Sequence, residues 1–231
     1  TVVFDALQLE YLAARVGVSV PKTILLPQKS YGDDVSSGTL EKNMRYVDWN
    51  GLIEQLGFPM YLKPHWGGGF RDVSRVETAE ELMRVYDASG KTTLIVQEAI
   101  AWQRYVRCLV VGQRDVRVAL WDPRLPHHER YARAHETMPA LDPGHVERAT
   151  ADALKITQAL GYDMNTVELA FVGDVPYAID YMNSAPDFDV TSLGEAHFGW
   201  VVTKMAELCI DLANDRPPAS YSWDALLRGP R

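Results

Sequence analysis

The feature that most constrains the fold is a short apolar run that ends in a lysine and a proline and leads into three consecutive glycines. The run Phe58–Lys63 precedes Pro64, and the glycines stand at 67–69. Such a run predicts a buried strand, and a proline ends its ladder pairing. A glycine backbone can present several N–H groups to one anion because no Cβ intervenes. The pattern therefore indicates a strand that delivers a lysine to an anion-binding loop, with a plain hairpin turn as the alternative.

This loop differs from the Walker phosphate loop. In the Walker pattern the lysine follows the glycines and is itself followed by serine or threonine. Here Lys63 precedes the glycines, and the sequence contains no Gly-Lys-Ser or Gly-Lys-Thr. A triphosphate site in this chain would have to be built in another way.

Composition narrows the class of protein. The chain has 231 residues, of which 47% are hydrophobic and 23% charged, as is usual for globular proteins. The net charge of −8 argues against a nucleic acid as the main partner. We find no signal peptide and no apolar stretch of the roughly 18 residues needed to cross a bilayer. We expect a cytoplasmic protein with no membrane partner. The start at Thr1 lies within what reads as structure, so we also expect a fragment of a longer protein.

The cysteines support an intracellular setting. Cys108 and Cys209 both lie in apolar runs. We expect two buried, reduced thiols, in preference to a disulfide or a catalytic nucleophile.

The order of the predicted elements indicates an α+β fold in two packed lobes. A first helix follows Asp5 and ends before Gly17, and residues 28–45 read as a polar loop. Further helices are expected at 49–56, 78–87, 144–160 and 193–212. Strands are expected at 60–64 and 94–98, with hairpins formed by 105–112 with 116–121 and by 165–172 with 175–181. For the apolar stripe of the last helix, the domain core and a dimer interface are the alternatives.

The second hairpin carries an acidic pair. Glu168 lies on one strand and Asp180 on the next, where antiparallel partners can point the same way. Two carboxylates on one face repel unless a cation lies between them. Asn183 adds a neutral oxygen, which completes a set of ligands suited to Mg²⁺. The alternative is a polar hairpin whose acids face water, and the nearby phosphate-loop pattern favours the metal.

Other polar segments give weaker indications of a binding site. The segment 127–131 reads His-His-Glu-Arg-Tyr, and its spacing suits no standard zinc site. Within it, Arg130 is a candidate second phosphate contact, because guanidinium matches phosphate oxygens bidentately. Asp187 and Asp189 are expected to be turn residues, rather than ligands of a metal or an amine. For Trp66 and Trp102 we favour core packing over lining a cleft.

Taken in order, these motifs resemble those of the ATP-grasp superfamily, which includes D-alanine–D-alanine ligase, glutathione synthetase and biotin carboxylase. The resemblance covers residues 5 to about 213. It implies one ATP-grasp domain over 1–213, with two α+β lobes whose antiparallel sheets enclose a nucleotide cleft. The small lobe would span about 22–97, and 214–231 would form an irregular tail. The family usually has an N-terminal substrate domain before this region, and we expect that domain to be missing from this sequence.

The resemblance also implies roles for individual residues. Lys63 and Arg130 would be catalytic, and Glu168, Asp180 and Asn183 would bind Mg²⁺ or Mn²⁺. The nucleotide would be held by Lys63, Gly67, Gly68, Gly69, Gln97, Glu98, Ala99, Ile100, Arg107 and Arg130.

Several positions depart from the family pattern. Ala6 stands where many members carry a second phosphate lysine, and Arg104 lies where a ribose-binding glutamate is common. Thr166 replaces a frequent arginine, and one extra residue separates Asp180 from Asn183.

The resemblance implies an ATP- and Mg²⁺-dependent ligase that joins a carboxylate to an amine or a thiol through an acylphosphate. Its partners would be small-molecule carboxylates and amines, with either a homodimer or a missing N-terminal domain completing the protein. Two alternatives remain open: an ATP-grasp kinase acting on a small molecule, and an ATP-binding module with weakened catalysis.

Overall fold

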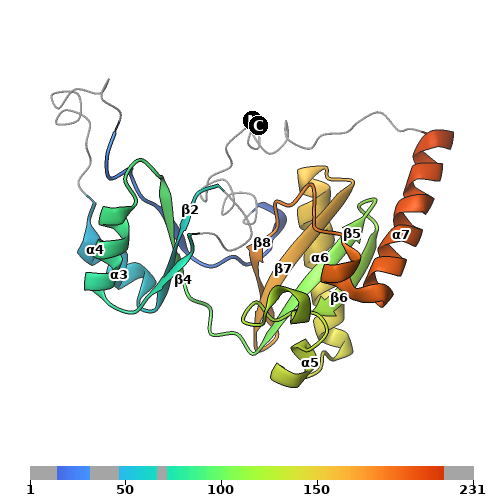
Figure 1. Cartoon of the computed structure of the whole chain (residues 1–231), viewed down its shortest axis with the longest axis horizontal. Coiled ribbons are helices and arrows are strands. Elements are labelled where there is room, and N and C mark those ends of the chain that lie inside the picture. The colour runs from blue at the N-terminus through green and yellow to red at the C-terminus, as the bar shows by residue number, and fades with distance from the viewer. Residues whose placement is uncertain (1–14, 32–46, 67–71, 216–231) are drawn as a thin grey trace. The chain divides into compact units, whose positions relative to one another are not determined.

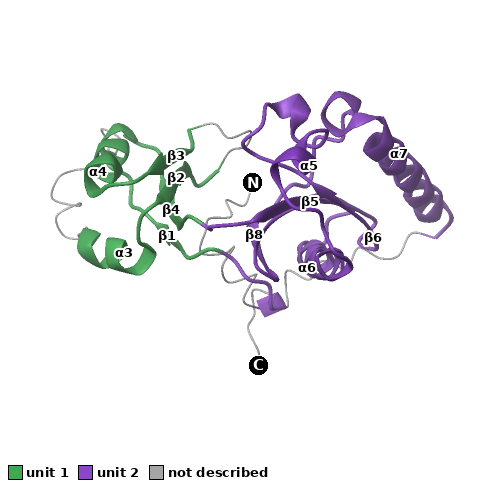
Figure 2. Ribbon diagram, turned by 90° about the horizontal axis from the view of Figure 1, so that it is seen from below, with its two compact units in different colours: residues 1–11, 21–99 green, residues 12–20, 100–231 purple. Residues whose placement is uncertain are grey.

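The computed structural model describes residues 15–31, 47–66 and 72–215 (Figure 1). This part of the chain divides into two compact units, which are coloured separately in Figure 2. Pro21–Ala99 belong to the first unit, and the second contains residues 15–20 and the chain from Ile100 onwards. Each unit is built around its own sheet.

The first unit is a four-stranded antiparallel sheet with two helices on one face. Its strands follow the order β1-β4-β2-β3. The elements are β1 (Thr23–Leu25), α3 (Trp49–Leu56), β2 (Met60–Pro64), β3 (Ser74–Val76), α4 (Ala79–Ala88) and β4 (Leu94–Glu98). Leu52 of α3 and Leu82 of α4 share one buried cluster with Met60, Leu62 and Val96. The helices therefore cover the sheet face on which these strand residues lie.

Short polar side chains begin both helices. Asp48 accepts a hydrogen bond from the Gly51 N–H at 2.9 Å, which satisfies a donor at the start of α3. Thr78 accepts one from the Glu81 N–H at 3.2 Å at the start of α4. Glu80 and Glu81 lie in the first turn of α4, where the helix dipole favours negative charge.

The second unit is also a four-stranded antiparallel sheet, with the order β6-β5-β7-β8. Its strands are β5 (Arg104–Val111), β6 (Asp115–Leu120), β7 (Met164–Val172) and β8 (Val175–Asp180). Its helices are η1 (His127–Glu129), α5 (Ala134–Thr137), α6 (Pro143–Leu160) and α7 (Val190–Asn214). The backbone of α7 is kinked at Gly194.

The two long helices pack on opposite faces of this sheet. The Cys108 thiol lies 3.8 Å from the Ala149 carbonyl oxygen of α6. The next residue, Leu109, clusters with Leu193 and Val201 of α7. Because successive strand residues point to opposite faces, the odd-numbered residues of β5 share the α7 face.

A β-bulge interrupts the pairing of β7 with β8. Leu169 lies opposite Ala178, but Glu168 lies opposite Asp180, so Ile179 is an extra residue on β8. The bulge brings the two acidic residues into register.

The structure confirms the expected fold class, with two antiparallel sheets and the helices expected at 49–56 and 144–160. The short strand β3 was not expected. Residues 15 and 16 are helical, and the rest of the predicted first helix lies outside the described residues, as do most of the polar loop and the tail. Within the described chain, no helix is long and apolar enough to span a membrane.

One expectation about burial was wrong. Cys108 is buried, but Cys209 is exposed. For the apolar stripe of α7, burial in the domain core and burial in a dimer were the two alternatives: Val201 and Leu208 are buried, whereas Val202 is 50% exposed. Only one side of this helix packs on the sheet, and Cys209 lies on another side.

Candidate functional site

The second unit gathers the predicted polar residues on one face of its sheet. Arg107 of β5 lies opposite Glu168 of β7, and Glu168 lies opposite Asp180 of β8. Paired residues of antiparallel strands point to the same face. The three residues therefore form a row across neighbouring strands.

Glu168 is a buried carboxylate with neighbours of both signs. Its Oε2 accepts a hydrogen bond from the Tyr105 hydroxyl at 2.8 Å, and its Oε1 lies 3.7 Å from Arg107 Nε. Burial, reinforced by the negative charge of Asp180, raises the pKa of Glu168 to about 7, although Arg107, Tyr105 and Arg130 act in the opposite direction. A divalent cation between the two acids would relieve this repulsion.

Arg107 is held in place by neutral oxygens. Its Nη1 donates to the Tyr131 hydroxyl at 3.4 Å and its Nη2 to Thr166 Oγ1 at 3.3 Å. The guanidinium also stacks over the Trp121 ring, with its carbon 5.5 Å from the ring centroid. Among the described residues, its buried Nε has no hydrogen-bond partner and lies 3.7 Å from Glu168 Oε1.

Asn183 reaches the same face through the backbone that follows β8. Its N–H donates to Asn165 Oδ1 at 3.1 Å, and its side-chain amide donates to Thr166 Oγ1 at 2.8 Å. Thr166 lies two residues before Glu168 on β7 and so points to the same face. Because the amide nitrogen is engaged, the side-chain oxygen of Asn183 is the atom available to a ligand.

These oxygens fit the predicted metal site in their chemistry. Glu168 and Asp180 supply carboxylates and Asn183 an amide, a donor set that suits Mg²⁺. Among the described residues, no group of three or more His, Cys, Asp or Glu side chains could hold a metal ion. The amide and solvent or substrate oxygens would therefore have to complete the coordination.

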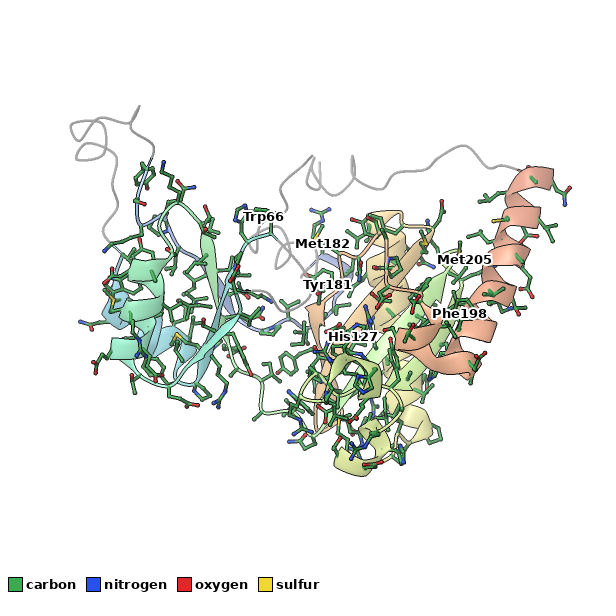
Figure 3. The ribbon with its side chains drawn as sticks, in the orientation of Figure 1. Trp66, His127, Tyr181, Met182, Phe198 and Met205 are labelled. Carbon is green, nitrogen blue, oxygen red and sulfur yellow. The ribbon has the colours of Figure 1, made fainter. Side chains whose placement is uncertain are left out.

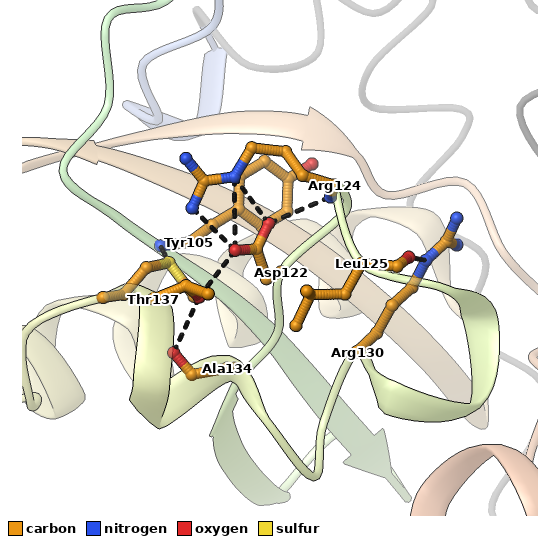
Figure 4. Close-up of polar contacts among 8 residues, drawn as sticks. Tyr105, Asp122, Arg124, Leu125, Arg130, Ala134 and Thr137 are labelled. Carbon is orange, nitrogen blue, oxygen red and sulfur yellow. Dashed lines mark hydrogen bonds and ion pairs between the residues drawn. The ribbon is translucent and has the colours of Figure 1, made fainter.

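Arg130 lies close to this row. Its Nε donates to the Leu125 carbonyl oxygen at 3.0 Å (Figure 4). Its guanidinium carbon lies 5.1 Å from the centroid of the Trp121 ring. Arg107 and Arg130 thus both stack on Trp121, and both lower the pKa of Glu168.

Asp122, which sequence reasoning missed, holds the loop that carries Arg130. Its side chain is fully buried and accepts hydrogen bonds from the backbone N–H and guanidinium of Arg124 and from Thr137 Oγ1 (Figure 4). Its own N–H donates to the Arg130 carbonyl oxygen at 3.0 Å. The sequence signal was Asp-Pro-Arg, in which the aspartate can bond the backbone two residues on.

The first unit holds the predicted lysine on the sheet face opposite its helices. Lys63 Nζ donates to Gln97 Oε1 at 3.2 Å, and Gln97 Nε2 donates to Thr23 Oγ1 at 3.0 Å. Glu98 accepts a hydrogen bond from the Lys22 N–H at 2.8 Å. The structure therefore brings Lys63 and Gln97 together on this face.

The other residues predicted to bind the nucleotide are Ala99, Ile100 and the three glycines. Ala99 donates its N–H to the Pro59 carbonyl oxygen at 3.3 Å, and the Ile100 carbonyl accepts from the Trp102 N–H at 3.0 Å. Gly67, Gly68 and Gly69 lie outside the described residues.

The two tryptophans considered for the cleft lie in different environments. Trp66, labelled in Figure 3, is 71% exposed, so the expectation of core packing was wrong for it. Trp102 packs edge-to-face on Tyr105, as expected of a core residue.

His127 forms an exposed pair with Asp187 at 3.4 Å. Asp189 caps the start of α7, so both aspartates have partners in or near turns.

Parts of the sequence are similar to parts of known proteins. No family model matches the sequence. The chain is 30% identical over 124 residues to the mitochondrial pyruvate carboxylase of Rattus norvegicus, a match that spans 48% of this chain and 10% of that protein. It is 31% identical over 74 residues to the D-alanine–D-alanine ligase of Polynucleobacter asymbioticus, which covers 32% of this chain and 22% of that protein. The chain thus matches about a tenth of the length of the pyruvate carboxylase.

Solved structures resemble almost the whole chain. The D-alanine–D-alanine ligase from Bacillus anthracis, complexed with ATP, superposes with a TM-score of 0.64 at 16% identity, covering 96% of this chain and 66% of that one. A RimK domain ATP-grasp protein from Sphaerobacter thermophilus superposes with a TM-score of 0.52 at 20% identity, covering 78% of this chain and 58% of that one.

Proposed function

Since the chain has the ATP-grasp fold, we propose that it is an ATP- and Mg²⁺-dependent ligase that joins a small-molecule carboxylate to an amine or a thiol. The observation that carries the proposal is the row formed by Arg107, Glu168 and Asp180, with Asn183 tied to the same face. Two carboxylates, an amide oxygen and a guanidinium on one face support the proposal, because a metal-bound triphosphate needs partners for both its cation and its anion.

In this proposal the candidate residues bind different parts of the nucleotide. Lys63, Arg107 and Arg130 would neutralise the phosphates, while Gln97 and Glu98 would contact the base. Glu168, Asp180 and Asn183 would hold Mg²⁺, which when bound offsets the negative charge of the phosphate oxygens. Positioning and charge neutralisation would supply most of the rate enhancement.

The reaction would proceed in two displacements. An oxygen of the substrate carboxylate attacks the γ-phosphorus, and the bond to the bridging oxygen breaks as ADP leaves, which gives an acylphosphate. The amine or thiol then attacks the acyl carbon, loses its proton and expels inorganic phosphate. Neither step requires a side-chain nucleophile.

The proposal is tested with Lys63→Ala and Asp180→Ala. Both should reduce substrate-dependent ADP release by at least about 100-fold, because each removes charge that stabilises the transferring phosphoryl group. ADP release is measured over a panel of small carboxylates paired with amines and thiols, and circular dichroism checks the fold.

Two exposed residues give matched controls. Lys29→Ala and Asp174→Ala remove the same charges from surface ion pairs in the respective units and should leave turnover unchanged. Full ADP release by both site variants would refute the assignment. A stable phosphoester in place of an amide or thioester plus free phosphate would identify a kinase, and nucleotide binding without turnover over the whole panel would identify a binding module.

A further inference from the structure

Tyr105 donates a hydrogen bond to the buried carboxylate of the candidate metal site. Its hydroxyl donates to Glu168 Oε2 at 2.8 Å, and both residues are buried, with 4% and 8% of their surfaces exposed. The other carboxylate oxygen lies 3.7 Å from Arg107 Nε, which is too far for a hydrogen bond. Among the described residues, Tyr105 is the hydrogen-bond donor to this carboxylate.

The phenol is itself held from several sides. Its ring packs edge-to-face on Trp102 at a centroid distance of 5.3 Å and lies 5.5 Å from the ring of Trp121. The backbone of Tyr105 is also held: its N–H lies 3.2 Å from the sulfur of Met138, and its carbonyl oxygen accepts a hydrogen bond from the Trp121 N–H at 3.0 Å. The hydroxyl therefore has little freedom to follow the carboxylate, and the carboxylate must orient to the hydroxyl.

The terminal torsion of a glutamate is soft, because rotation about its last bond has only a broad, two-fold preference. A hydrogen bond from a rigid donor to one oxygen fixes that torsion. It leaves Oε1 as the oxygen with no hydrogen-bond donor among the described residues. Partners that orient a metal ligand in this way commonly change metal affinity by 10–100-fold when they are removed.

We propose that Tyr105 is a positioning residue that holds Glu168 in the orientation needed to bind the divalent cation. The inference rests on the proposed function, since it takes Glu168 as a metal ligand. Tyr105 would act only through Glu168, without touching the nucleotide or the reacting groups.

Tyr105→Phe tests this by removing one oxygen atom and keeping the ring. The probe is MnCl2 added to the protein in the presence of a non-hydrolysable ATP analogue, with bound Mn²⁺ measured by electron paramagnetic resonance. We expect Mn²⁺ affinity to fall by about 10-fold or more. Affinity for the analogue without metal, measured by calorimetry, should remain within about two-fold, because Tyr105 does not contact the nucleotide.

Two further variants separate positioning from structure. Tyr86→Phe is the matched control, because Tyr86 is also a buried tyrosine that packs edge-to-face on a tryptophan, Trp49, in the other unit. It should leave Mn²⁺ affinity unchanged. In a Glu168→Gln background, Tyr105→Phe should cause no further loss, since its effect passes through the carboxylate.

The outcomes are distinguishable. Wild-type Mn²⁺ affinity in Tyr105→Phe, together with loss of binding in Glu168→Gln, would overturn the inference and leave the proposed function standing. No Mn²⁺ binding by the wild type with the analogue would overturn both. Equal losses of Mn²⁺ and of metal-free nucleotide affinity in Tyr105→Phe would assign the hydroxyl a structural role and also overturn the inference.

Discussion

Asp122 shows how a single charged side chain can organise a loop from the inside. Its carboxylate is fully buried, but Arg124 and Thr137 supply donors to both of its oxygens. Burial alone would raise the pKa of Asp122. The hydrogen bonds from Arg124 and Thr137 outweigh burial and lower the pKa to about 2. The loop therefore contains a carboxylate whose ionised form is favoured by folding.

The lowered pKa gives a prediction for stability as a function of pH. A carboxyl whose pKa falls from 3.8 to about 2 on folding stabilises the folded state fully above about pH 4, and this contribution is lost as the pH falls through 2. Asp122→Asn should therefore lower the free energy of unfolding at pH 7 by about 1–2 kcal/mol, a range that allows for the solvent exposure of Arg124. The difference from wild type should narrow towards pH 2, as measured by urea unfolding at each pH.

A surface residue provides the comparison. Asp174 is 74% exposed and pairs with Arg148, so Asp174→Asn should change stability by no more than about 0.5 kcal/mol. A stability difference between wild type and Asp122→Asn that stays constant from pH 7 to pH 2 would show that ionisation of Asp122 contributes nothing.

Some of the candidate site could be predicted from the sequence at the level of single residues. The sequence predicted that Glu168, Asp180 and Asn183 would lie close together, because all three belong to one hairpin and the residues that follow it. Within a hairpin, the spacing along the chain predicts which residues are neighbours. Tyr105 was missed because its partner Glu168 is 63 residues away. Only the pairing of β5 with β7 brings these two together, and an isolated tyrosine in an apolar strand reads as a core residue.

At the level of elements, helices with clear ends were predicted closely. Helix α6 begins after Asp142, whose side chain accepts a hydrogen bond from the His145 N–H, and ends at Gly161 in the left-handed conformation. The strand β3 was missed because three residues give too little periodicity. If the pairing of β7 with β8 is counted from the turn at Gly173–Asp174 without a bulge, Ile179 falls opposite Glu168. In the structure a bulge makes Asp180 the partner of Glu168. The alternation of apolar and polar residues in the sequence does not predict that bulge.

Gly161→Ala tests the end of α6. The glycine has φ of 68° and ψ of 29°, where a Cβ is strained, so we expect a loss of about 1 kcal/mol in the free energy of unfolding. Gly199→Ala is the control, because Gly199 lies within α7 and a Cβ there would meet nothing within 4 Å. It should be neutral or stabilising by up to about 1 kcal/mol. Chemical denaturation measures both, and equal effects would argue against the role of Gly161 as a cap.

At the scale of the whole molecule, each unit has a core of its own. Leu82 is fully buried in the helix-covered core of the first unit, and Leu169 is fully buried in the sheet of the second. The division into two α+β units follows from the order of strands and helices in the sequence, and could be predicted for that reason. The arrangement of each sheet depends on long-range pairing and could not.

Separate cores predict separable unfolding. Leu82→Ala and Leu169→Ala should each cost about 2–5 kcal/mol, from lost burial and the cavity left behind. In differential scanning calorimetry each variant should shift the transition of its own unit more than that of the other. A single transition that both variants shift equally would show that the two cores unfold together.

The bulge in β8 has a consequence for how this hairpin can change in length. With Ile179 deleted, Leu169 would still face Ala178 and Glu168 would still face Asp180, now in an unbroken ladder. An insertion or deletion of one residue normally reverses every side chain beyond it. At this position the strand can gain or lose a residue while the two acids stay opposite each other, so related sequences can differ in length here and still share the same pair.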